Sequence, residues 1–145
     1  MTTTDLNADD ELELSSIVIR ADFSDEAAWQ KVWTAIAAPV GAFKANLIPV
    51  EDRQHDGLTA ERVVTILPKH FRHTFVFIVD RTTLVESMHP VLVVDVSEQP
   101  GRSFRVIPTE MWAVQNNLKL ANMDWEDFSE STDADGVFRG FPPPR

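Results

Sequence analysis

Residues 75–79 read FVFIV and residues 91–96 read VLVVDV, and these two almost continuously apolar stretches decide the fold of the chain. A strand with this pattern is covered on both faces, as at the centre of an α/β sheet. Asp80 and the ten residues Arg81 to Pro90 separate the two stretches. A parallel crossover usually needs about a dozen residues or more. The linker therefore predicts either one short helix over a face of the sheet or an antiparallel pair of strands.

The N-terminal half predicts two further strands and two helices around this centre. Residues 17–19 and 43–50 are rich in β-branched or other apolar residues and predict strands. Between them, Ser24 predicts the N-cap of a helix. The buried stripe of that helix recurs at helical spacing and consists of Trp29, Val32, Trp33 and Ile36. A second helix begins with Thr59 as its N-cap and ends at Pro68.

Shorter elements follow in the C-terminal half. Residues 104–107 predict a strand that forms a hairpin with the apolar stretch before it. Thr109 predicts the cap of a short helix, residues 118–122 alternate as a brief strand would, and Asp124 predicts the cap of a last helix. The order of elements predicts an α/β fold: a single domain with a mixed, mostly parallel central sheet of about five strands and helices packed on it.

Acidic residues are concentrated at the two ends of the chain. The net charge is −10, residues 1–14 and 122–135 contain acids and no base, and the body between them is nearly balanced. The first segment predicts a disordered acidic tail. Residues 15–141 are predicted to form the single α/β domain, and residues 142–145 a Pro-rich C-terminal tail.

Composition also limits the function classes. Cysteine is absent, which excludes disulfides, thiol catalysis and cysteine-ligated metals, and leaves a thioredoxin-like arrangement without its redox motif. We see no signal peptide, no transmembrane stretch and no basic cluster, so we expect a cytoplasmic protein that binds neither membranes nor nucleic acid. Phosphate-binding glycine loops and nucleophile elbows are missing, and no cofactor is predicted. The sequence makes no prediction about the oligomeric state.

Three aspartates follow or end predicted strands: Asp22, Asp80 and Asp95. In open parallel sheets, ligands bind at the carboxyl ends of strands. Carboxylates at that edge could hold a divalent metal such as Mg²⁺. The structural alternative is that each aspartate starts a turn or caps a helix. His70 and His73 have a spacing that would suit zinc on a helix, but a solvated loop before a strand explains them better.

The second acidic segment contains two aromatic residues. The candidate partner-binding residues are Asp124, Trp125, Glu126, Asp127, Phe128 and Glu130. An aromatic residue in an acidic rim suits an interface with a basic protein, because Trp is enriched at binding hot spots. The alternative is that Trp125 and Phe128 anchor an amphipathic helix whose other side is acidic and solvated.

From residue 17 to 141 the chain resembles a family of small acidic, mostly actinobacterial proteins known as a domain of unknown function. The stretches that carry the resemblance are IRADFSDEAAW (19–29), HPVLVVDV (89–96), GRSFRVIPTEMWAVQNNL (101–118) and ANMDWEDFSESTDADGVFRGF (121–141). The resemblance implies a stand-alone cytoplasmic domain and brings with it no activity, ligand or catalytic residue. The segment ANMDWEDF is loosely similar to strand-then-helix segments of small toxin-immunity proteins.

Three functions follow as hypotheses. The first is a non-enzymatic interaction domain that presents its acidic, Trp-containing surface to a basic protein, in the manner of an immunity protein or inhibitor. The alternative is a small ligand- or divalent-metal-binding enzyme that uses the strand-end carboxylates. A structural or regulatory subunit, dimeric through an edge strand, is a third interpretation.

Overall fold

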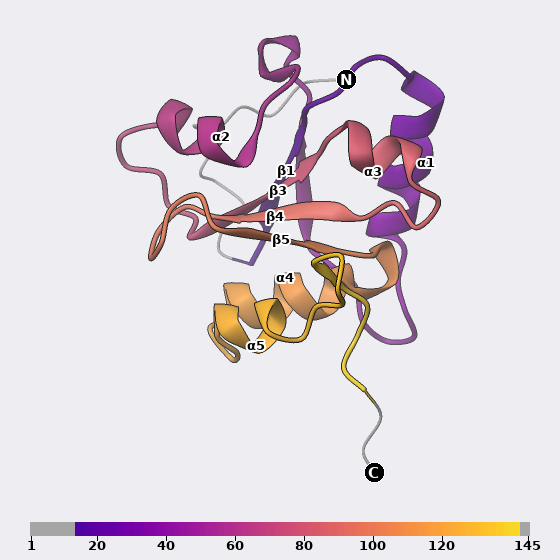
Figure 1. The fold of residues 1–145 in the computed structure, drawn as a ribbon, viewed down its shortest axis with the longest axis vertical. Coiled ribbons are helices and arrows are strands. Elements are labelled where there is room, and N and C mark those ends of the chain that lie inside the picture. The colour runs from indigo at the N-terminus through magenta and orange to yellow at the C-terminus, as the bar shows by residue number, and fades with distance from the viewer. Residues whose placement is uncertain (1–13, 143–145) are drawn as a thin grey trace.

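The computed structural model describes residues 14–142, and six strands form one mixed sheet in it (Figure 1). The strands are β1 Ser16–Arg20, β2 Leu47–Val50, β3 Phe75–Val79, β4 Val91–Asp95, β5 Ser103–Val106 and β6 Val137–Phe138. Their order across the sheet is β2-β1-β3-β4-β5-β6. Neighbours β2, β1 and β3 run parallel, β4 runs antiparallel to both β3 and β5, and β6 runs parallel to β5. The predicted α/β class with a mixed sheet is confirmed.

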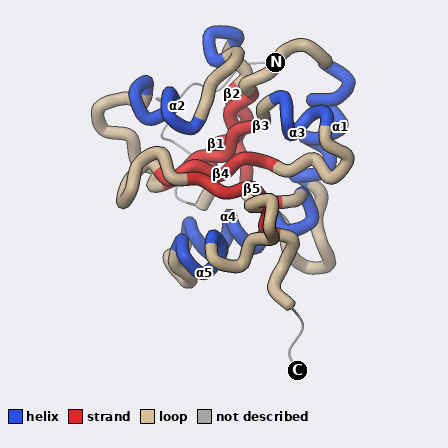
Figure 2. The backbone as a smooth tube through the Cα atoms, in the orientation of Figure 1, coloured by secondary structure: helices blue, strands red, loops and turns tan. Residues whose placement is uncertain are grey.

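The described residues also contain five α-helices, which pack in two layers on the sheet. They are α1 Glu26–Ala37, α2 Ala60–Ile66, α3 Arg81–Val85, α4 Met111–Lys119 and α5 Trp125–Ser129. Side chains from α1, α3, α4 and α5 share one buried cluster with Phe77 and Val93, whereas α2 contributes Val63 to a second cluster with Ile78 and Val94. Figure 2 shows α2 on one side of the red strands and α4 and α5 on the other.

The continuous apolar pattern of β3 has the expected cause. Its side chains alternate between the two clusters, with Phe75, Phe77 and Val79 in one and Val76 and Ile78 in the other. All five are at most 3% exposed. Covering both faces of a strand removes the need for polar residues on either face.

The linker between β3 and β4, which is Asp80 followed by the ten residues Arg81 to Pro90, forms a short helix and then a reversal of the chain. Asp80, the first residue after β3, caps α3 through a capping box with Thr83, so the helix begins immediately after it at Arg81. The segment Glu86–Pro90 then returns the chain, with His89 in the left-handed region at φ 49. The linker is shorter than a usual crossover, and β4 pairs antiparallel to β3.

Several local predictions are wrong, for identifiable reasons. Asp25, not Ser24, caps α1 by accepting the Ala28 N–H at 3.0 Å, while the Ser24 hydroxyl donates to Asp22. Residues 118–122 are the end of α4 and the turn after it, where Ala121 adopts a φ of 57 that terminates helices.

Other element boundaries hold or shift. Thr59 and Asp124 cap α2 and α5 as predicted. The strand predicted from residue 43 begins only at Leu47, and β6 was not predicted at all. The predicted tails at 1–14 and 142–145 fall almost wholly on residues 1–13 and 143–145, which lie outside the described part of the chain.

Candidate functional site

The three strand-end aspartates do not share one site. Asp22 and Asp80 follow the neighbouring parallel strands β1 and β3 and lie at the same edge of the sheet. Asp95 ends the antiparallel strand β4, where it pairs with Phe75 at the start of β3, so it lies at the opposite edge. The prediction that these carboxylates converge is therefore wrong. Within residues 14–142, no group of three or more His, Asp or Glu side chains could hold a metal ion.

Asp80 is fully engaged in contacts within the protein. Its two oxygens accept from Arg105 at 3.0 and 2.7 Å, and Oδ1 also accepts from the backbone N–H and the hydroxyl of Thr83. Burial opposes ionisation of Asp80, but the Arg105 and Thr83 contacts outweigh it and hold the pKa of the carboxyl below its usual value. Asp80 thus fixes the start of α3 and orients Arg105.

Asp95 closes the loop between β4 and β5. It accepts the backbone N–H groups of Ser97, Glu98 and Gln99 and the Arg102 side chain at 2.7 Å. Burial raises its pKa, and these donors lower it further than burial raises it. These contacts agree with the alternative prediction that Asp95 starts a turn and is not a metal ligand.

Asp22 lies beside a buried arginine at the end of β1. Its Oδ1 accepts the Ser24 N–H at 2.9 Å. Partial burial opposes ionisation, yet the Ser24 hydrogen bonds and the nearby Arg81 keep the pKa of Asp22 below its usual value. Arg20 is 4% exposed, pairs with Glu26 and Glu51, and lies over the rings of Phe23 and Trp29. These contacts hold the β1 end of the carboxyl edge rigid.

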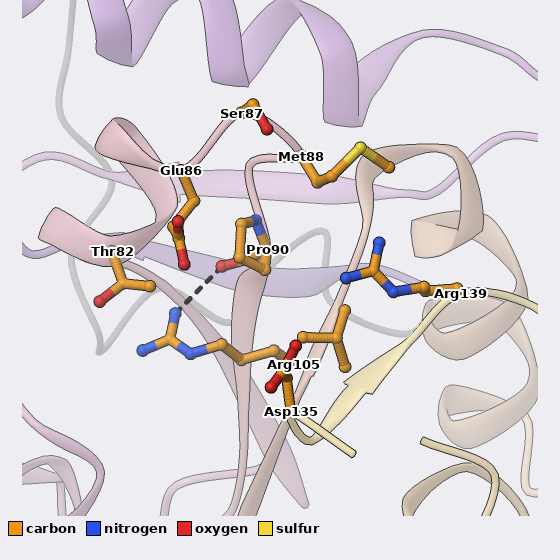
Figure 3. Close-up of a pocket in the computed structure, with 9 residues that line it drawn as sticks. Thr82, Glu86, Ser87, Met88, Pro90, Arg105, Asp135 and Arg139 are labelled. Atoms are coloured by element: carbon orange, nitrogen blue, oxygen red, sulfur yellow. Dashed lines mark hydrogen bonds between the residues drawn. The ribbon is translucent and has the colours of Figure 1, made fainter. Parts of the chain in front are cut away.

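A cavity of about 440 Å³ opens at this same edge, beside the paired Asp80 and Arg105 (Figure 3). Its lining comes from α3 and the segment after it, from β5, and from the chain around β6: Thr82, Glu86, Ser87, Met88, Pro90, Arg105, Asp135, Val137 and Arg139. Arg105 Nη1 also donates to the Pro90 carbonyl at 3.0 Å, which is the dashed line in Figure 3. The cavity therefore brings together residues from three segments that are distant in the sequence.

Neither arginine of this cavity was singled out from the sequence. One signal was present: Arg105 interrupts the otherwise apolar run Phe104 to Ile107. Arg139 gave no such signal, because it reaches the cavity only through the pairing of Val137 in β6 with Arg105 in β5.

The aromatic residues of the second acidic segment are buried. Trp125 is 8% exposed and Phe128 is fully buried, and both pack against Phe104, with ring centroids 4.8 and 6.5 Å away. The Arg102 guanidinium lies 5.0 Å from the centre of the Trp125 ring. The two aromatics therefore anchor α5 to the sheet, as the structural alternative describes, and they do not project into solvent.

The carboxylates around these aromatics lie at the surface. The exposed members of the candidate set are Asp124, Glu126, Asp127 and Glu130. Glu126 pairs with Arg102 at 2.9 Å, and Asp124 and Asp127 form the capping box of α5. We call these four residues the acidic surface.

His73 and Lys119 form a partly buried polar contact away from the cavity. Lys119 Nζ lies 3.2 Å from Nδ1 of His73, whose side chain is buried. The Nε2 atom of His73 has no hydrogen-bond partner within residues 14–142. Burial, together with the charges of Lys119 and Arg72, lowers the pKa of His73 to about 4. His70, by contrast, is exposed.

Two comparisons and one structural feature bear on the class of protein. No helix among residues 14–142 has the length and apolar character needed to cross a membrane. Curated proteins of known function include none that matches this chain. Among protein families, residues 15–141 match the domain of unknown function DUF6924, and the match includes every strand and helix described above. The chain therefore belongs to the DUF6924 family.

Proposed function

We propose that the protein is a non-enzymatic interaction domain that binds a basic partner protein through the acidic surface of α5. An immunity protein or inhibitor that neutralises a basic protein is the concrete form of this function. The proposal concerns the carboxylates of Asp124, Glu126, Asp127 and Glu130, which are exposed. Trp125 and Phe128 support that surface from below and make no direct contact with the partner.

The observation that carries the proposal is the rigid presentation of the charge. α5 has only five residues, and a helix this short is unstable in isolation. Here Trp125 and Phe128 fix its inner side in the core, and the capping box fixes its start. Charges held in fixed positions can complement a basic surface without the entropy cost of ordering a mobile segment.

Charge of one sign on a folded surface also accelerates association with a partner of opposite sign. Such steering raises association rates at low salt and is screened within about 10 Å at 0.1 M salt. Only Glu126 of the four carboxylates has a basic partner within the described residues, namely Arg102. The remaining charge stays available to another protein.

Charge reversal on the acidic surface tests the proposal. The variant Glu126→Lys with Glu130→Lys changes two exposed side chains one helical turn apart and leaves the capping box intact. Its matched control is Asp56→Lys with Glu61→Lys, which alters the net charge equally at exposed positions in the loop before α2 and on α2. Immobilised protein is incubated with extract of the host cell, and bound proteins are identified by quantitative mass spectrometry at low and at high salt.

The expected result is a basic protein that the wild type and the control retain at low salt and that the α5 variant loses. Salt should weaken its retention, because the interaction is electrostatic. If the α5 variant and the wild type retain the same proteins, or if neither retains any, the acidic surface serves solubility alone.

A further inference from the structure

The cavity beside Arg105 has the position and the shape of a ligand site. It lies at the edge where the parallel strands β1, β3 and β5 end, which is where open α/β sheets bind ligands. Its volume of about 440 Å³ falls within the range of roughly 300 to 1,000 Å³ that is usual for small-molecule sites. The cavity shares no residue with the acidic surface of α5, so it is independent of the function proposed above.

The charged groups of the lining differ in how far they are already used. Asp80 and the Pro90 carbonyl hold the Arg105 guanidinium in place. Arg139 donates through Nε to Asp133, which leaves its two terminal nitrogens without a partner among the described residues. The carboxylates of Glu86 and Asp135 accept no hydrogen bond and form no ion pair within residues 14–142, and both residues are exposed.

Glu86 and Arg139 lie on opposite sides of the cavity. In Figure 3, Glu86 lies on one side of Pro90 and the Arg139 guanidinium on the other, whereas the Arg105 guanidinium lies on the side of Glu86 and Thr82 and points away from Arg139. The lining holds two positive and two negative side chains. Asp80 already neutralises Arg105, so the groups without a partner among the described residues are the terminal nitrogens of Arg139 and the carboxylates of Glu86 and Asp135. A ligand with a charge of one sign would satisfy either the nitrogens or the carboxylates and leave the other set without a partner. A small molecule that carries both charges satisfies the lining.

We propose that this cavity binds a zwitterion of the α-amino acid class. The ligand carboxylate lies on the terminal nitrogens of Arg139, whose planar fork suits two-point recognition of a carboxylate. The ligand ammonium lies against Glu86, with Asp135 completing the negative side of the lining. Met88, Pro90 and Val137 supply the apolar wall for the ligand side chain.

Titration of the full-length protein with free amino acids tests the proposal. The isotope-labelled protein is titrated with each common L-α-amino acid at millimolar concentration, and backbone amide shifts are followed by NMR. At least one amino acid should shift resonances of residues 82–88 and 135–139 and leave those of α5 unchanged. Absence of such shifts with every amino acid overturns the proposal.

Matched ligands separate zwitterion recognition from weaker, nonspecific contacts. The best-binding amino acid is compared with its N-acetyl derivative, which keeps only the negative charge, and with its α-carboxamide, which keeps only the positive charge. Each derivative should bind about tenfold more weakly or worse, since each loses one charged contact. Equal binding of either derivative overturns the assignment of a zwitterion.

Two variants locate the charges. Arg139→Gln and Glu86→Gln should each weaken binding of the amino acid by about tenfold, whereas Arg62→Gln and Glu61→Gln, at exposed positions on α2, should not. Circular dichroism establishes that each variant is folded. Unchanged affinity in Arg139→Gln or Glu86→Gln overturns the roles given to these residues. None of these outcomes depends on a partner protein, so failure here is distinguishable from failure of the acidic-surface proposal.

Discussion

Arg105 of β5 and Asp80 at the end of β3 form a two-point ion pair, with Nη2 2.7 Å from Oδ2 and Nη1 3.0 Å from Oδ1. The pair reaches across β4, which lies between the two strands in the sheet. The same carboxylate caps α3, and the same guanidinium holds the Pro90 carbonyl. One contact thus ties together the helix, the return segment and the strand that surround the cavity.

Replacing Asp80 should lower the free energy of unfolding, and the more of these contacts a variant loses, the larger the effect should be. Asp80→Ala removes the cap of α3 and leaves Arg105 largely buried without its counter-ion. We expect a loss of about 2 to 3 kcal/mol in the free energy of unfolding, toward the low end for a buried pair because both side chains are about one-fifth exposed. Urea denaturation measures the loss. Asp80→Asn keeps an oxygen for the Thr83 N–H and should lose less, and equal losses in the two variants would contradict a role for the cap.

His73 should make the protein less stable as the pH falls from 6.5 toward 4. Its pKa in the folded protein is about 4, below the unfolded value of 6.5. The unfolded state therefore binds more protons in this range, and the stability present above pH 6.5 is lost as the pH falls through the folded value. Each unit of difference corresponds to about 1.4 kcal/mol. Chemical denaturation across this range measures the slope.

The matched variants for this slope are His73→Gln and His70→Gln. The first removes the buried imidazole beside Lys119 and should flatten the pH dependence. The second removes an exposed histidine and should leave the dependence unchanged. A slope that persists in His73→Gln would show that other groups cause it.

The aromatics of α5 should matter for stability far more than its carboxylates do. Phe128 is fully buried and contacts the rings of Phe104, Phe138 and Phe141. Phe128→Ala should cost about 3 to 5 kcal/mol, as is usual for a large side chain in a core. Glu130→Gln should change stability by no more than about 0.5 kcal/mol, because the side chain is at the surface. Thermal unfolding compares the two, and a small effect of Phe128→Ala would contradict the packing described.

The stability of the protein should depend on the side-chain amide of Gln115, even when a substitution keeps the volume of the side chain. Its side chain is fully buried, its oxygen accepts the Asn46 N–H at 2.8 Å, and its nitrogen donates to the Leu14 carbonyl and the Ser16 hydroxyl at 3.1 Å each. Gln115→Met fills the space but leaves buried groups unpaired, and we expect a loss of about 2 to 4 kcal/mol. Denaturant titration measures it. Gln115→Leu should behave alike, whereas a neutral effect in both would indicate that water replaces the amide.

The prediction of the fold succeeded where a local pattern has one structural cause. The apolar runs of β3 and β4, the stripe of α1 and the caps at Thr59 and Asp124 each follow from burial or from hydrogen bonding within a few residues. The direction of β4 could not follow in the same way, because a linker of this length permits both a crossover and a reversal. β6 has two residues, too few for any periodic pattern.

In the candidate sites, too, the local features could be predicted from the sequence and the contacts between distant segments could not. The role of Asp80 as a helix cap can be predicted from the sequence, because Asp is a preferred N-cap residue. That it pairs with Arg105, and that Arg139 arrives beside them, depends on which strands are neighbours in the sheet. Trp125 shows how sequence neighbours can mislead. Its acidic neighbours in the sequence lie on the outer side of α5, whereas the ring itself packs on the inner side against Phe104, which is distant in the sequence.

The two outermost strands have a consequence for how the protein can associate with itself. At one edge of the sheet β2 contains Pro49, which has no N–H to donate, and at the other β6 offers only two residues. Exposed strand edges are the usual templates for pairing between chains, and proline and short length are recognised ways to blunt them. Growth of the sheet from one molecule into the next is therefore disfavoured at both ends. This protects a highly β-branched centre from aggregation and leaves side-chain surfaces, rather than backbone pairing, as the means of contact with other molecules.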